Sequence, residues 1–377
     1  MNTILKQAAI LALSVCAAHS SLALSPGSRV DNFRLLDAEG KSHELYYLSD
    51  MKAVVLMVQG NGCPIVRQAV PAFRELRDQY RAKGVQFLLI NSNLQDKRDA
   101  IAAESKEFGF DIPILVDDTQ LIGESLGFNR TAEVLVINPK NWTLAYRGPI
   151  DDRLSYEKQR PAASHHYTRD AIDAVIAGQA VKNPQVNSAG CIINMPEQER
   201  RPAHSKISYT KEVAPVLTEK CVACHQTGGV APWAMTSYDV VKGFAPMIRE
   251  VVRTKRMPPW HADPHYGSFV GDRSLSEAQT KTLVHWIEAG APRGVGADPL
   301  TKVKPETDEW KLGKPDAIID LPAYTVPATG VIEYQCPEVK NPIGRDVWIR
   351  ALEVHVGNKS AVHHIIVNNP SDVRDAR

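Results

Sequence analysis

The chain has 377 residues, of which 44% are hydrophobic, and its 44 Lys and Arg residues nearly balance its 43 Asp and Glu residues. This length predicts two or three domains, and the apolar fraction is sufficient for packed cores. The balanced charge argues against a nucleic-acid surface, an acidic tail or a basic membrane stripe.

Residues 1–23 have the layout of a secretory signal peptide. A short polar stretch with Lys6 precedes an apolar run at residues 8–15, which is too short to span a bilayer, and Ser21-Leu22-Ala23 offers small residues at a cleavage site. No later segment is long and apolar enough to span. We therefore predict an exported protein, periplasmic or secreted, with no membrane span in the mature chain.

Residues 24–181 alternate apolar runs with helical patterns. Buried strands are predicted at 53–58 and 85–91, helices at 68–83 and 96–108, an extended segment at 112–116, a hairpin from 132–137 to 143–147, and a closing helix at 170–177. This order predicts an α/β sheet covered by helices.

Cys63 follows the first buried strand, and Pro71 lies eight residues later inside the predicted helix. This arrangement resembles the thioredoxin-like (redoxin) family, which implies that Cys63 is the nucleophilic cysteine, with its pKa lowered by a helix N-terminus. Val66 stands where the family has a second cysteine, and Ala132 stands where it has a cis-proline. Cys191, in a polar linker over residues 182–206, could be the partner thiol of Cys63. The alternative is two thiols without turnover, free or paired in a static disulfide.

Residues 207–292 are predicted to be helical around Cys221-Val222-Ala223-Cys224-His225. This spacing is the attachment signature of haem c, in which both cysteines form thioethers and His225 is the proximal iron ligand. A zinc site, a thioredoxin-type pair and a Cys221–Cys224 disulfide are the competing interpretations. Zinc would need a second ligand pair, for which only His261 and His265 lie nearby.

Met257 is the predicted distal iron ligand, because Pro258 and Pro259 would hold its loop rigidly. His261, Met247 and Met235 are alternatives. The run from Cys221 through Met257 to Trp286-x-x-Ala289-Gly290-Ala291-Pro292 resembles class I c-type cytochromes that are fused into large bacterial exported proteins. The resemblance implies an all-α cytochrome domain over residues 207–292.

A linker at 293–309 precedes residues 310–377, where alternating apolar residues predict strands at 317–321, 331–334, 347–356 and 362–367. The adjacent pair His363-His364 resembles the start of a copper type II, ascorbate-dependent monooxygenase. This implies an incomplete all-β, jelly-roll-like sandwich in which His363 and His364 bind copper, with the remaining ligands beyond Arg377. The alternative is an ordinary histidine pair at a strand edge.

The three segments together predict a multidomain redox protein. The leading hypothesis is an exported haem c electron-transfer protein that relays electrons to a copper monooxygenase-like centre. The first alternative is a thiol-dependent peroxidase or disulfide oxidoreductase that uses Cys63 with Cys191. The second is a non-catalytic carrier whose thioredoxin-like part is a scaffold. The expected partners are redox proteins or small reductants.

Overall fold

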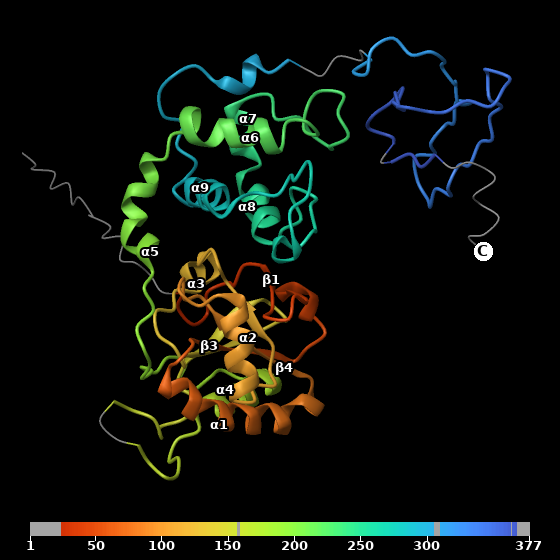
Figure 1. Cartoon of the computed structure of the whole chain (residues 1–377). Helices are drawn as coiled ribbons and strands as arrows, with labels where there is room; N and C mark the ends of the chain where they lie inside the picture. The colour runs from red at the N-terminus through yellow and green to blue at the C-terminus, as the bar shows by residue number, and fades with distance from the viewer. Residues whose placement is uncertain (1–23, 157–158, 305–309, 363, 368–377) are drawn as a thin grey trace, which may run out of the picture. The chain divides into compact units, whose positions relative to one another are not determined.

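The computed structural model describes residues 24–156, 159–304, 310–362 and 364–367. The chain divides into two compact units, one ending at Pro202 and the other beginning at Ala203, and each is described by itself (Figure 1). The predicted signal peptide lies outside the described residues. Within the described ranges, no helix is long and apolar enough to cross a membrane.

The first unit is built on a five-stranded sheet in the order β5-β4-β3-β6-β7. The central strand β3 pairs in parallel with β4 and antiparallel with β6, and all its residues are buried. β5 extends the parallel side, and β7 extends the antiparallel side. Runs of apolar and β-branched residues fit strands that are covered on both faces. The bounds are β3 Ala53–Gln59, β4 Val85–Asn91, β5 Ile114–Val116, β6 Val134–Asn138 and β7 Thr143–Gly148.

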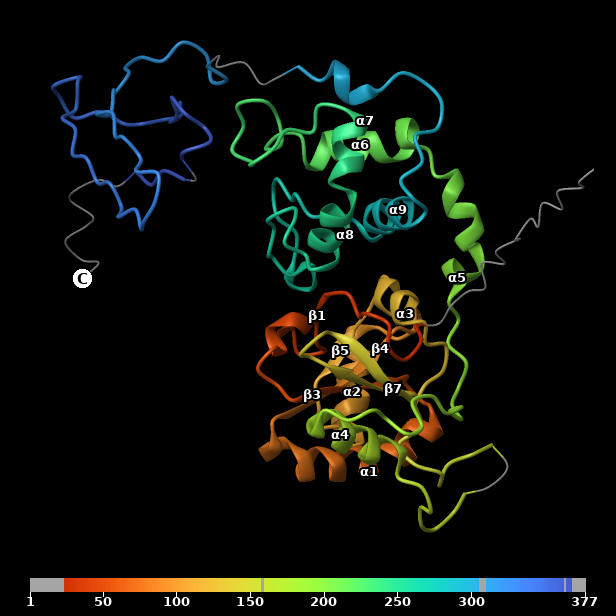
Figure 2. The same cartoon turned by 180° about the vertical axis from the view of Figure 1, so that it is seen from behind.

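Two hydrophobic clusters cover the two faces of this sheet. Val55 and Met57 of β3 face a cluster formed with helices α1 and α4, whereas Val54 and Leu56 face a second cluster formed with the β1–β2 hairpin and α3. Figures 1 and 2 show these layers from opposite sides. The bounds are β1 Arg34–Leu36, β2 Ser42–Glu44, α1 Pro64–Tyr80, α2 Arg98–Glu107, α3 Leu121–Leu126 and α4 Tyr167–Ala177.

The polar segment predicted as a linker at 182–206 is not a free connection. Ile193 and Met195 are only 3% and 5% exposed and belong to the second hydrophobic cluster of the first unit. Helix α5 (Pro196–Arg200) follows them. The linker was predicted because the segment is rich in proline and charged residues, but the burial of Ile193 and Met195 is enough to hold the segment against the sheet.

The second unit is helical up to residue 302. A π-helical turn (Tyr209–Val213) leads into α6 (Ala214–Lys220), and α7 (Tyr238–Gly243), α8 (Ala245–Arg253) and α9 (Glu277–Glu288) follow. Trp286 lies at the centre, with its ring 5.8 Å from Tyr209 and 6.4 Å from Tyr238. The predicted helical segment is therefore present, but helices alone do not identify a cytochrome, and that identification stays a prediction.

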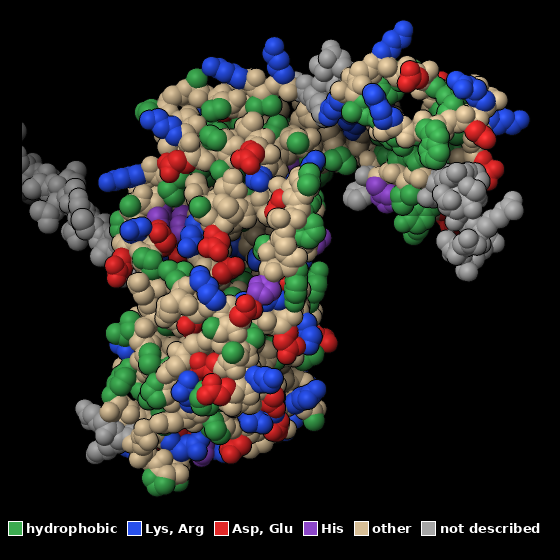
Figure 3. Space-filling model, viewed as in Figure 1, with side chains coloured by type: hydrophobic (Ala, Val, Ile, Leu, Met, Phe, Trp, Pro, Cys, Tyr) green, Lys and Arg blue, Asp and Glu red, His purple; other side chains and the backbone are tan. Residues whose placement is uncertain are grey.

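The strands predicted after residue 310 are not seen in the part of this region that the structure describes. No strand is assigned in residues 310–362 and 364–367, and apolar side chains there are exposed, with Val331 at 94% and Trp348 at 102%. Figure 3 shows such side chains on the surface of this segment. Alternating apolar residues form stable strands only when a second layer covers them, and the described residues supply none. The jelly-roll-like sandwich is therefore not seen.

Candidate functional site

Cys63 lies in the connection between the central strand β3 and the first long helix, α1. β3 ends at Gln59, a short loop follows, and Cys63 is the residue that precedes Pro64 at the start of α1. Proline is favoured at this first helical position because it has no N–H to satisfy and its φ already suits the helix. The helix N-terminus places a partial positive charge beside the sulfur, which favours the thiolate.

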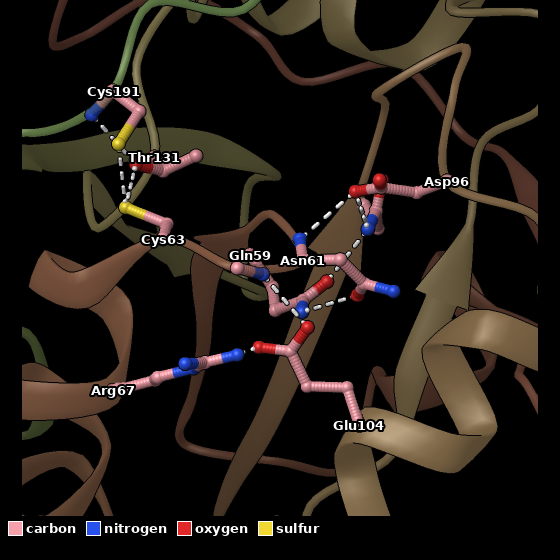
Figure 4. A network of polar contacts seen from close by, with 10 residues as sticks. Gln59, Asn61, Cys63, Arg67, Asp96, Glu104, Thr131 and Cys191 are labelled. Carbon is pink, nitrogen blue, oxygen red and sulfur yellow. Dashed lines mark hydrogen bonds and ion pairs between the residues drawn. The ribbon is translucent and has the colours of Figure 1, made fainter.

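The structure brings Cys63 and Cys191 together, although 128 residues separate them. Their sulfur atoms are 2.9 Å apart, and the Thr131 Oγ1 atom lies 3.1 Å from the Cys63 sulfur (Figure 4). Cys63 is 4% exposed, whereas Cys191 is exposed. Two sulfurs at this separation need only a small movement to form a disulfide bond of about 2.05 Å.

Backbone contacts hold Cys191 in this position. The Thr131 N–H donates to the Cys191 carbonyl at 3.0 Å, and the Cys191 N–H donates to Thr131 Oγ1 at 2.9 Å. Gly190 packs so closely that a Cβ atom there would lie 1.9 Å from the Thr131 carbonyl oxygen. Sequence reasoning missed both Thr131 and Gly190 as site residues. The only signal was their position beside Ala132 and Cys191.

The two thiols differ in acidity. Burial alone would raise the pKa of the Cys63 thiol, but hydrogen bonds from Cys191 and Thr131 outweigh burial and lower it. Burial raises the pKa of the Cys191 thiol, and the adjacent Cys63 sulfur raises it further. Because Thr131 Oγ1 accepts the Cys191 N–H, its own hydrogen is available to Cys63. In the reduced pair, the negative charge therefore belongs on Cys63.

A buried polar network supports the loop before Cys63. Asp96 accepts the Asn61 N–H at 2.9 Å, and Glu104 accepts the Gly62 N–H at 2.7 Å and the Arg67 side chain at 3.2 Å (Figure 4). Glu104 is 8% exposed. Charge-assisted bonds of this kind are among the stronger ones in proteins. They fix the backbone that presents Cys63 and do not themselves contact its sulfur.

Both departures from the thioredoxin-like pattern have structural counterparts. Val66 lies in the first turn of α1 and is fully buried in the core, so a hydrophobic contact replaces the second cysteine. Ala132 has a φ of 59°, and its N–H donates to the Val58 carbonyl at 2.7 Å. Proline at this position could neither adopt that φ nor make that hydrogen bond.

A cleft of about 200 Å³ lies near the residues that adjoin Thr131 and Cys191 in the sequence. Its walls include Ala132 and Ala189, which flank the two backbone segments that meet at the site, and Ile65 and Ala69 of α1. Arg153 and Arg160 also line it. The carboxylates of Asp151 and Asp152, respectively, pair with these arginines. The cleft therefore combines small apolar walls with paired charges, and neither Cys63 nor Cys191 lines it.

In the second unit, Cys221, Cys224 and His225 lie on one turn after α6. The Cys224 and His225 N–H groups both donate to the Cys221 carbonyl, at 3.1 and 2.9 Å. The His225 Nδ1 atom lies 3.0 Å from the Trp233 carbonyl, which fixes the tautomer and leaves Nε2 for another bond. Burial lowers the pKa of His225 and so favours its neutral form. Burial raises the pKa of the Cys221 thiol to about 11. This donor set fits haem c.

The predicted distal iron ligand Met257 and the predicted copper ligands His363 and His364 have less structural support than His225. Met257 follows α8 and is 40% exposed. The described contacts do not join it to His225. His363 lies outside the described residues, and His364 is exposed, 6.2 Å from Tyr334 ring to ring. Within the described ranges, no group of three metal-ligating side chains includes His364. The copper site stays a prediction.

Part of the first unit matches a known protein family. Residues 25–153 match the Redoxin family model. Thiol-disulfide oxidoreductase ResA of Bacillus thuringiensis is 30% identical over 96 residues, and ResA of Bacillus cereus is 30% identical over 98. Each match covers 26% of this chain and 54% or 55% of the relative, so the chain spans about half the length of these curated relatives.

Solved structures of two other proteins are similar to part of the chain. A hypothetical protein of Sinorhizobium meliloti is 28% identical, with 46% of this chain and 95% of that one covered and a TM-score of 0.42. A protein named "putative Thiol:disulfide interchange protein DsbE" of Chlorobium tepidum is 18% identical, with 41% of this chain and 99% of that one covered and a TM-score of 0.34.

The family match and the sheet topology define the class of the first unit: it contains a redoxin domain with a thioredoxin-like α/β fold. Both ResA relatives are named thiol-disulfide oxidoreductases. These findings agree better with the thiol-based alternative than with the haem relay that the sequence favoured. The family model covers residues 25–153, and the cytochrome and copper segments stay predictions.

Proposed function

We propose that the first unit is a thiol-disulfide oxidoreductase whose redox pair is Cys63 and Cys191. The observation that carries this proposal is the 2.9 Å approach of the two sulfurs at the start of α1, with Thr131 bonded to both residues. A scaffold without turnover would not need a thiolate-stabilising hydroxyl at a cysteine pair. Redox proteins or small thiols are its expected partners.

The chemistry of the pair is a reversible two-electron exchange. The reduced pair gives two electrons and two protons to a partner disulfide, which becomes two thiols, while Cys63 and Cys191 form a disulfide. The helix N-terminus and Thr131 supply the thiolate, and the segment around Cys191 keeps the second sulfur within reach. Such a pair persists in an oxidising compartment, which supports the predicted export.

Equilibration with defined ratios of reduced and oxidised glutathione tests this function. We expect the full chain to show one two-electron transition assigned by peptide mapping to a Cys63–Cys191 disulfide. We also expect it to reduce a disulfide-bonded protein such as insulin, and Cys63→Ser to abolish both. Val66→Ala is a control that removes buried apolar volume at the same helix and leaves both thiols. An insulin-reducing rate unchanged in Cys63→Ser refutes the proposal.

A second function, electron transfer by haem c, is supported by the turn at Cys221, Cys224 and His225. In this proposal Cys221 and Cys224 would hold the haem covalently, and His225, whose Nδ1 contacts the Trp233 carbonyl, would offer Nε2 to the iron. The bound haem would supply a one-electron centre. Met257 is the proposed distal ligand. The full chain, matured in a host that attaches haem c, should show a reduced α-band that Cys221→Ala loses. An unchanged spectrum refutes this proposal.

A further inference from the structure

The two sulfurs of the thiol pair differ sharply in access. Cys63 is 4% exposed, whereas Cys191 is exposed. Figure 4 shows the Cys63 sulfur directed toward Cys191 and Thr131. A disulfide-bearing partner must bring its own sulfur into contact with a cysteine sulfur of this chain. At Cys63 that contact requires displacement of the segment that carries Cys191.

That segment is held firmly. Thr131 bonds the Cys191 backbone through both its N–H and its hydroxyl. On either side, the Ile193 N–H donates to the Asn129 carbonyl at 2.9 Å, and the Gly190 N–H donates to the Tyr156 hydroxyl at 2.9 Å. The neighbouring Ile193 side chain is buried. Opening the segment would break these contacts together, so the closed arrangement is the one that a partner meets.

We propose that Cys191, and not Cys63, is the sulfur that exchanges with the redox partner, and that Cys63 acts only inside the protein. This inference rests on the proposed oxidoreductase function. It reverses the assignment implied by the thioredoxin-like resemblance, in which the cysteine at the helix N-terminus attacks the partner.

The steps balance as two thiol-disulfide exchanges. As the Cys191 sulfur attacks a partner disulfide, the Cys191 thiol gives its proton to the Cys63 thiolate 2.9 Å away. A mixed disulfide forms at Cys191, and the partner's other sulfur leaves as a thiolate that takes up this proton, which returns Cys63 to its thiolate form. The Cys63 thiolate then attacks the Cys191 sulfur. The intramolecular disulfide forms, and the partner leaves as its second thiol. The partner disulfide is reduced by two electrons, and the cysteine pair is oxidised by two.

The reverse direction fits the acidities of the two thiols. A partner thiolate attacks the exposed Cys191 sulfur of the oxidised pair and displaces Cys63. The thiol of lower pKa is the better leaving group in such exchanges, and the bonds from Cys191 and Thr131 lower the pKa of Cys63 despite its burial. The accessible sulfur therefore receives the attack, and the stabilised sulfur departs.

Single-cysteine trapping tests the assignment. Reduced full-length Cys63→Ser and Cys191→Ser variants are each mixed with oxidised glutathione, and the glutathione adducts are located and timed by peptide mass mapping. We expect Cys63→Ser to collect a stable adduct at Cys191, and Cys191→Ser to form an adduct at Cys63 at least about tenfold more slowly. Serine preserves the size of the side chain that covers Cys63.

Cys336, which is exposed, is the internal control and should react equally in both variants. A Cys63 adduct in Cys191→Ser that forms as fast as the Cys191 adduct in Cys63→Ser overturns the inference, as does no adduct at Cys191. The wild-type glutathione titration separates the two failures. If the Cys63–Cys191 disulfide forms and insulin is reduced, the oxidoreductase function stands and only the assignment of the exchanging sulfur is lost.

Discussion

The substitution Gly190→Ala addresses the contact that brings Cys191 to Cys63. The added Cβ would lie 1.9 Å from the Thr131 carbonyl oxygen and 2.9 Å from its carbonyl carbon. Both are backbone atoms, so no side-chain rotation relieves the overlap. The segment must move away and strain or lose its hydrogen bonds to Thr131 and Tyr156.

Overpacking of this kind costs about 1–3 kcal/mol. The overpacking strains the segment that keeps the two sulfurs 2.9 Å apart. It therefore lowers the stability of the Cys63–Cys191 disulfide more than it lowers the folding stability of the first unit. A cost of about 2 kcal/mol corresponds to a roughly 30-fold smaller equilibrium constant for forming the disulfide. For a two-electron couple this shifts the reduction potential by about 45 mV toward easier reduction.

The assay is the glutathione redox titration of the Cys63–Cys191 pair in the wild type and in Gly190→Ala. Gly243→Ala is the matched control, because a Cβ atom at Gly243 meets nothing within 4 Å, and its potential should equal that of the wild type. Circular dichroism of both variants checks that the helices remain. A Gly190→Ala potential within error of the wild type would refute the idea that close packing at Gly190 positions Cys191.

Three further outcomes are expected. Thr131→Val should raise the pKa of the Cys63 thiol because it removes a hydrogen bond that lowers this pKa, whereas Thr131→Ser should not. The pH dependence of the Cys63 alkylation rate measures both pKa values, and equal pKa values in the two variants contradict the reasoning. Burial raises the pKa of Asp117 from its usual 3.8 to about 6, so the folded chain keeps a proton that the unfolded chain has lost between these values. Relative to Asp117→Asn, wild-type stability should therefore fall by up to about 3 kcal/mol as pH rises from about 4 to about 6; a pH-independent difference in denaturant unfolding contradicts this. In the haem-loaded chain, Met257→Ala should lower the reduction potential of the haem because a thioether ligand raises it. Met247→Ala, at a 52% exposed position, is the control and should leave the potential unchanged. Equal haem potentials in the two variants exclude Met257 as the ligand.

Much of the first unit could be predicted from local pattern. The apolar runs at 53–58 and 85–91 became β3 and β4, and the predicted hairpin became β6 and β7. The first long helix begins at Pro64, four residues before the predicted start, because a proline at the first helical position needs no partner. The β1–β2 hairpin was not predicted, since three-residue strands leave almost no periodic signal.

The thiol site could be predicted only in part. The nucleophile position of Cys63 and its possible partner Cys191 follow from the pattern of residues, but Thr131 and Gly190 act through contacts between segments about 60 residues apart. Sequence spacing carries no information on such contacts. The strands predicted after residue 310 failed for a related reason. Alternation shows which face of a strand could be buried, but it does not show that a covering layer is present.

The two departures from the family pattern can be understood as one change. Once Cys191 supplies the second sulfur from residues 190–193, position 66 no longer needs a thiol and can hold a buried valine. Once Ala132 replaces proline, its N–H can bond Val58 and its backbone can turn at a φ of 59°. That turn follows Thr131 directly, and both the N–H and the hydroxyl of Thr131 meet the segment that carries Cys191. Alanine at position 132 is therefore part of what allows the partner thiol to come from a distant segment, and Ala132→Pro should weaken the Cys63–Cys191 disulfide in the glutathione titration.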